Sequence, residues 1–163
     1  MKNQEETWKL FEQNPLTHSA AHYLITIHEL LQEQGYARLT DIAKKLDITR
    51  GSASISIKTL KKKNLIIEDH NKFLKLSAEG KKLATSIEKN DQLLVAFFKE
   101  ILLVKPEQAE IDACKIEHLL SPETAAKLQQ FVQLITGNNP LAKKFLSTVH
   151  KQHLPAKKPA SKS

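Results

Sequence analysis

Apolar residues recur every three or four positions along most of this 163-residue chain, which is the spacing of one face of an α-helix. The first long segment of this kind follows Ser19, a candidate N-cap, and includes Leu24 and Ile27 before Gly35 ends it. The chain is therefore predicted to place a long helix after a short N-terminal arm.

Residues 40–76 are predicted to form two short helices and a hairpin. Thr40 can cap the first helix, and residues 49–52 supply a turn and a cap for the second. Two short apolar runs then flank the polar segment 69–72, which has the composition of a hairpin turn. This order of elements predicts a helix-turn-helix followed by a β wing.

The second half of the chain is predicted to be helical. A long helix follows Ser77 and reaches about Val104, and two more helices are expected over 107–120 and 122–136, with a short one ending near His150. The fold class is therefore mainly α. We expect an N-terminal arm (1–18), a winged helix-turn-helix domain (19–76), a linking helix with a second helical domain (77–150) and a disordered basic tail (151–163).

Positive charge is concentrated in the predicted helix-turn-helix. The chain has a net charge of +7, and the segment from Arg38 to Lys63 contains eight basic and two acidic residues. A localised excess of this kind indicates a polyanionic partner, and a helix-turn-helix indicates double-stranded DNA. A lysine run such as 61–63 also occurs as a solvated helix end, so the combination of features carries this interpretation.

The predicted second helix of this motif offers small polar groups at its start. In a helix-turn-helix the first turn of that helix meets base edges in the major groove, while flanking cations hold phosphates. The predicted DNA contacts are Arg38, Thr49, Arg50, Gly51, Ser52, Ser54, Ile55, Ser56, Lys58, Lys61, Lys62, Lys63 and Lys72.

Candidate metal ligands occur in the second half. Asp91 interrupts an apolar helical stripe, where a carboxylate is costly unless it is paired or bound to a cation. Glu110, Cys114, Glu117 and His118 have the spacing of a single helical face. Carboxylate, thiolate and imidazole together suit a first-row divalent metal.

Two other interpretations of Cys114 stay open at this point. A lone helical cysteine is often a core residue, and a neighbouring Glu-His pair often lies on the surface. Cys114 and His118 also have the residue types of a nucleophile and its base, but no oxyanion loop or orienting third group accompanies them. We therefore expect no enzyme.

Residues 19–136 resemble the metal-dependent repressors typified by the diphtheria toxin repressor and the manganese transport regulator. The resemblance rests on HYLITIHELLQEQGYARLTDIAKKL, the winged motif, SAEGKKLA in the linking helix and CKIEHLLS in the second half. It implies a winged-helix domain followed by a helical metal-binding and dimerisation domain, and a homodimer that binds a palindromic operator.

The resemblance also implies a ligand set. Cys114, Glu117 and His118 fall on metal-ligand positions of the family, and the cysteine matches the iron-type pattern. His22 and Asp91 fall on two further ligand positions, from separate helices. The cofactor implied is Fe(II) or Mn(II), with Zn(II) as an alternative.

This chain departs from both family patterns. Glu110 stands where the iron type has a second-site histidine. Ile25 replaces a glutamate of the manganese type and Val95 a glutamate of the iron type. One metal site is therefore expected, whereas the number of sites and the identity of the metal stay open.

The function implied is a metal-dependent transcriptional repressor of metal-uptake genes. No stretch approaches the ~20 uninterrupted apolar residues of a membrane helix, the N-terminus is polar, and there is one cysteine, so we expect a cytoplasmic protein. The alternatives are a winged-helix regulator switched by an organic ligand or by oxidation of Cys114, and a DNA-binding protein without sequence preference.

Overall fold

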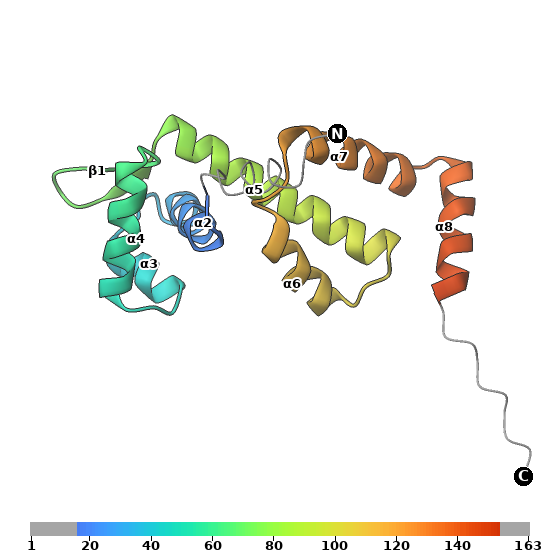
Figure 1. Ribbon diagram of the computed structural model, residues 1–163, viewed down its shortest axis with the longest axis horizontal. Helices are drawn as coiled ribbons and strands as arrows, with labels where there is room; N and C mark the ends of the chain where they lie inside the picture. Colours follow the sequence, from blue (N-terminus) through green and yellow to red (C-terminus); the bar gives the residue numbers. More distant parts are fainter. Residues whose placement is uncertain (1–15, 154–163) are drawn as a thin grey trace, which may run out of the picture. The chain divides into compact units, whose positions relative to one another are not determined.

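The computed structural model describes residues 16–153 (Figure 1). Contacts divide the chain into two compact units, the first ending at Lys89 and the second beginning at Asn90. Most of the predicted N-terminal arm and basic tail lie outside the described residues. Among the residues that are described, no helix is long and apolar enough to cross a membrane.

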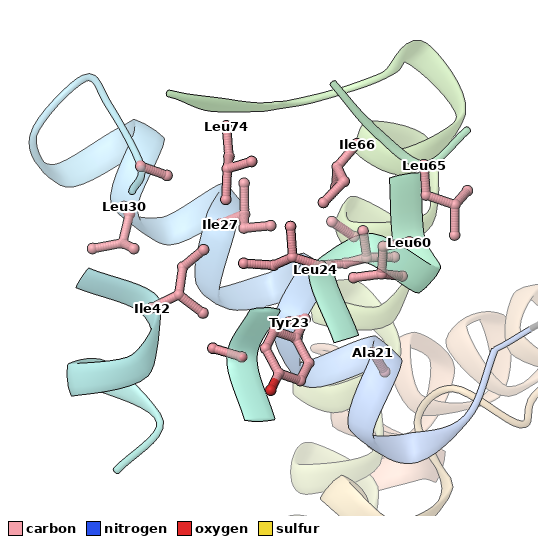
Figure 2. Close-up of a cluster of buried hydrophobic side chains, with 14 of the residues drawn as sticks. Ala21, Tyr23, Leu24, Ile27, Leu30, Ile42, Leu60, Leu65, Ile66 and Leu74 are labelled. Carbon is pink, nitrogen blue, oxygen red and sulfur yellow. The ribbon is translucent and has the colours of Figure 1, made fainter. Parts of the chain in front are cut away.

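In the described part of the first unit, helices pack against a small hairpin. Helix α2 (His18–Glu33) is followed by α3 (Leu39–Lys45), α4 (Arg50–Lys62), strands β1 (Ile66–Glu68) and β2 (Leu74–Leu76), and the first part of α5 (Ala78–Ala96). Figure 2 shows Leu24 and Ile27 of α2 at the centre of the core, and both are fully buried. Side chains from α3, α4 and both sides of the hairpin converge on them, namely Ile42, Leu60, Leu65, Ile66 and Leu74.

The helix ends show which capping predictions hold. Helix α2 is capped by Thr17 rather than by Ser19, and Gly35 follows its end with a φ of 80°, a left-handed conformation that favours glycine. The prediction that Thr40 caps α3 is wrong, because that helix begins at Leu39 after Arg38, which makes no side-chain capping bond. Thr49 caps α4 as expected, its Oγ1 accepting from the Ser52 N–H at 3.1 Å.

The predicted wing forms as an antiparallel hairpin in which Ile66 pairs with Leu76 and Glu68 with Leu74. Its turn is fixed by Asp69, whose Oδ1 accepts from the backbone N–H groups of residues 71 and 73, both at 2.9 Å. The wing therefore has a defined shape without a glycine in its turn.

Gly80 lets the start of α5 pack closely on the residue that precedes the wing. A Cβ at this position would overlap the carbonyl oxygen of Leu65, which already accepts from the Ser77 N–H at 3.0 Å. Only glycine permits this approach of helix to backbone.

The second unit contains the end of α5 and three further helices. The predicted long helix is interrupted, since α5 gives way at Phe97 to a π-helical turn, η1 (Phe97–Ile101). Helix α6 (Pro106–Ile116) ends earlier than predicted, and its last turn is followed by a non-helical turn over 117–119. Helices α7 (Pro122–Thr136) and α8 (Pro140–His153) complete the unit, so α8 continues into the first residues assigned to the tail. The predicted fold class is confirmed.

Candidate nucleic-acid interface and metal centre

The outer face of α4 has the composition of a DNA-reading surface. Ala53, Ile57 and Leu60 face the core. The opposite face presents Ser54, Lys58 and Lys62 together with Ile55, which is 71% exposed. An apolar side chain this exposed, among hydroxyl and ammonium groups, fits contact with a thymine methyl group beside phosphate contacts.

The other predicted contacts lie around this face. Arg50, Gly51 and Ser52 are exposed in the first turn of α4, where the Ser52 Oγ lies 3.0 Å from the Thr49 Oγ1. Ser56 is half-buried. Lys63 is the exposed C-cap of α4, and Lys72 is exposed in the wing turn with a φ of 66°. The structure thus groups the predicted set on the helix-turn-helix and the wing of the first unit.

One predicted phosphate contact is engaged within the protein. The Lys61 ammonium, on the last turn of α4, donates to the Glu68 carboxylate on β1. This ion pair lowers the pKa of Glu68, and the Lys72 ammonium lies 3.7 Å from the other oxygen of the same carboxylate. Glu68 was not predicted, and it connects α4 to the wing.

Arg38 is held between two aromatic rings that the sequence did not single out. Its guanidinium carbon lies 4.5 Å from the ring centre of Phe73 and 5.4 Å from that of Tyr36. The two rings meet edge to face with centres 5.6 Å apart. These contacts hold the guanidinium beside the wing.

In the second unit, acidic groups from α5 and from the end of α6 meet. Glu117, the C-cap of α6, is 3% exposed and is hydrogen-bonded to the Asp91 carboxyl of α5. Burial, the charge of Asp91 and this hydrogen bond raise the pKa of Glu117 to about 7. Burial also raises the pKa of Asp91, with a further contribution from Glu110.

Cys114 belongs to the same cluster. Burial and the charges of Glu117 and Asp91 raise the pKa of its thiol. Within the described residues, the charges that shift the pKa values of Asp91, Cys114 and Glu117 all belong to other acidic side chains. Carboxylates and a thiol held together form a donor set that a divalent cation fits.

The predicted ligands differ in their placement. His118 is partly buried in the turn after α6, and Glu110 is exposed on α6, where its charge reaches Asp91. His22 belongs to the first unit, on α2, where its Nε2 lies 3.1 Å from the Nε2 of His18. The second unit therefore brings together Asp91, Cys114 and Glu117, with Glu110 and His118 on the same segment.

Sequence reasoning missed Asn90, which holds this cluster in place. Its side chain is 7% exposed, and its amide donates to the Glu117 carbonyl oxygen at 2.8 Å. A buried amide bonded to a helix C-cap fixes the end of α6 against α5. The signal available in the sequence was a polar residue three positions after Ile87, on the face of the helix where an apolar residue is expected.

A winged helix-turn-helix with a basic outer face, joined in one chain to a helical unit with a partly buried acid and thiol cluster, defines a metal-responsive DNA-binding regulator. Residues 15–74 match the family model described as "Iron dependent repressor, N-terminal DNA binding domain". Residues 77–140 match the one described as "Iron dependent repressor, metal binding and dimerisation domain". The chain belongs to the iron-dependent repressor family of transcriptional regulators.

Individual relatives agree with this assignment. The HTH-type transcriptional regulator MntR of Bacillus velezensis is 31% identical over 136 residues, which are 83% of this chain and 94% of the relative. The regulator of the same name from Bacillus subtilis is 30% identical over the same shares. The predicted resemblance to this family is confirmed. The predicted partners, DNA and a second copy in a dimer, and the predicted cofactor, an iron-type or manganese-type metal, are also confirmed as those of the family.

Solved structures share the fold. The manganese regulator SloR matches with a TM-score of 0.64 at 24% identity, over 72% of this chain and 55% of that one. IdeR of T. acidophilum matches with a TM-score of 0.57 at 22% identity, over 68% of this chain and 52% of that one. The present chain thus spans about half the length of these two structures.

Proposed function

We propose that this protein is a cytoplasmic, non-enzymatic repressor of divalent-metal uptake genes that binds a palindromic operator as a metal-loaded homodimer. The observation that carries the proposal is the cluster of the buried Glu117 with the half-buried Asp91 and Cys114, in the unit that matches the family's metal-binding domain. The basic face of α4 is the DNA-binding end of the same chain.

The proposed ligands of the second unit are Asp91, Cys114, Glu117 and His118, with Glu110 as an ancillary one. A divalent cation bound there would offset the negative charge of these acidic side chains. To hold the cation, Glu117 would give up the proton that its raised pKa retains near neutral pH, and Cys114 would bind as the thiolate. Asn90 holds the carboxyl-terminal end of α6, which carries two of the ligands.

His22 is the ligand that we expect from the first unit. This expectation rests on its family ligand position and on the preference of divalent transition metals for imidazole. Helix α5 begins in the first unit and ends in the second, so it is the covalent connection between DNA-binding and metal-binding parts. Ligation would select the arrangement of the two units that fits an operator, from those already populated.

The proposed homodimer is supported by apolar side chains on α7 and α8. Leu134 is 59% exposed, Leu141 76% and Phe145 50%. Large apolar side chains this exposed, on two helices that contact each other, support an association surface. They lie within or just beyond the segment matched to the dimerisation domain.

The raised pKa of Cys114 weighs against a thiol switch as the alternative function. Redox-sensing and nucleophilic cysteines are activated by neighbouring cations or helix N-termini, which lower their pKa. Cys114 has acidic neighbours instead. This environment favours a role as a metal ligand.

The test is operator binding as a function of metal. Metal-loaded protein would first select its sites from a random duplex library under anaerobic conditions. Affinity for the selected duplex is then measured by fluorescence anisotropy with chelator, Fe(II), Mn(II) or Zn(II). We expect tight binding only with metal, and at least a ~1,000-fold preference over random duplex.

Glu117→Gln provides the matched variant, because it preserves the shape of the buried side chain and removes its charge. We expect this variant to bind random duplex as the wild type does, at low salt, and to lose the metal response. Equal operator affinity of the wild type with chelator and with every metal would refute the proposal.

A further inference from the structure

Two histidines one helical turn apart on α2 place their Nε2 atoms close together. The Nε2 atoms of His18 and His22 lie 3.1 Å apart, and the two rings meet edge to face with centres separated by 4.4 Å. The i and i+4 spacing is the one that places two imidazoles on a shared metal in helical metal sites. His18 was not among the predicted ligands.

The distance between the two nitrogens matches a shared ligand sphere. Imidazole nitrogens bind a transition metal at about 2.0–2.1 Å, so two of them at octahedral to tetrahedral angles lie roughly 2.9–3.4 Å apart. The observed separation falls within this interval. The separation of the two nitrogens is therefore compatible with both binding one metal.

The helix start fixes the position of His18. The Oγ1 of Thr17 accepts from the Ala20 N–H at 3.2 Å, so the first turn of α2, which contains His18, is capped. His22, one turn later, is partly buried.

We propose that His18 is a metal ligand beside His22, and that this pair of imidazoles makes the regulator prefer Fe(II) and Zn(II) over Mn(II). The inference rests on the proposed function, which supplies the remaining ligands. It adds a ligand outside the set implied by the family resemblance, and it narrows the choice of metal.

The chemistry of the donors carries the preference. Imidazole suits iron and zinc, and thiolate selects them further, whereas manganese favours carboxylate, carbonyl and water oxygens. With His18, His22 and Cys114, the proposed site would have three nitrogen or sulfur donors before His118 is counted. A manganese site would be expected to contain more oxygen donors.

The experiment measures metal affinity of the full chain with two metals. Zn(II) is titrated against a competing chromophoric chelator and Mn(II) is followed by the loss of its free-ion electron paramagnetic resonance signal. The proteins compared are the wild type, His18→Ala and, as a control, His70→Ala. His70 is an exposed histidine in the wing turn that contacts the Asn71 side chain.

We expect His18→Ala to weaken Zn(II) binding by roughly ten- to a hundredfold and Mn(II) binding by less than about threefold, since one nitrogen ligand is lost. His70→Ala should change neither affinity. A further variant, His18→Asp, replaces the nitrogen donor with oxygen and should move the Zn(II)/Mn(II) affinity ratio towards manganese. Thermal unfolding by circular dichroism of the metal-free variants establishes that each is folded.

An unchanged Zn(II)/Mn(II) ratio in both His18→Ala and His18→Asp would overturn this inference and leave the proposed function standing, provided that wild-type operator binding needs metal. If the wild type binds its operator equally well without metal, the proposed function and the inference fail together. The two failures are therefore distinguishable in one set of proteins.

Discussion

Removing Lys61 and Glu68 together is expected to leave the salt dependence of operator binding unchanged, although Lys61 lies on the DNA-reading helix. The double variant Lys61→Ala/Glu68→Ala deletes one positive and one negative charge, so the net charge of the domain stays the same. In the structure the Lys61 ammonium is bonded to the Glu68 carboxylate, and their side chains are 41% and 22% exposed. The pair contributes no net charge towards phosphates.

The magnitude follows from counterion release. Each phosphate contact contributes about 0.9 to the slope of log affinity against log salt concentration. The double variant should therefore keep the wild-type slope, whereas Lys62→Ala, on the exposed side of α4, should reduce it by roughly one. The double variant loses a partly exposed ion pair between α4 and the wing, so its free energy of unfolding should fall by only about 0.5 kcal/mol.

The assay is fluorescence anisotropy with the selected operator at a series of salt concentrations, at saturating metal. The wild type, the double variant and Lys62→Ala are compared under identical conditions. A slope reduced by about one unit in the double variant would show that Lys61 leaves Glu68 to bind a phosphate. That result would refute the interpretation that Lys61 stays bonded to Glu68 and so connects α4 to the wing.

Three further predictions concern the second unit. Asn90→Leu removes the hydrogen bond to the Glu117 carbonyl and should lower the free energy of unfolding, measured in denaturant titrations, by roughly 1–3 kcal/mol. The same variant should bind metal more weakly, and an unchanged metal affinity would contradict a positioning role for Asn90. Because the pKa of Glu117 is raised to about 7 in the folded protein, stability of the metal-free protein should fall as pH rises from about 4.5 to about 7. Metal must displace this proton, so apparent metal affinity should rise over the upper part of that range, and a pH-independent affinity would contradict it. Leu134→Glu and Leu141→Glu each place a charge on the exposed apolar surface and should shift sedimentation from dimer to monomer, whereas persistence of the dimer in both would locate its interface elsewhere.

The helices and the wing of the first unit were predictable because each is specified by local chemistry. Periodic apolar residues gave the core face of α2, with Leu24 and Ile27 at its centre. Thr49 caps the start of α4, and Gly35 follows the end of α2 in a left-handed conformation that favours glycine. The polar turn 69–72 separated two short apolar runs, and Asp69 fixes it with bonds to residues nearby in sequence.

Most of the unpredicted features depend on contacts between different elements of the structure. The Lys61–Glu68 ion pair and the stacking of Arg38 on Phe73 connect α4, the wing and the segment before α3, which helical periodicity does not report. Asn90 interrupts an apolar face for a reason that appears only when the end of α6 is placed against it. The π-helical turn after Ala96 likewise has no composition signal.

The candidate ligands were identified by residue type and spacing, and their roles stay predictions. Cys114 and Glu117 were expected on one helical face, and the structure adds that Glu117 lies in the turn that ends this helix and is bonded to Asp91. The pairing of His18 with His22 has the same spacing. The sequence does not predict this pairing, because His18 precedes the predicted helix start, whereas the observed helix begins at His18.

The central claim is that this regulator binds its metal through the acid and thiol cluster of the second unit. Crystals of the full chain grown anaerobically with Fe(II) test it directly, through anomalous difference maps on either side of the iron absorption edge. We expect a peak about 2.0–2.4 Å from the Cys114 sulfur and from a carboxylate oxygen of Glu117. An ordered iron bound elsewhere, with Cys114 and Glu117 making no contact to it, would contradict this proposal.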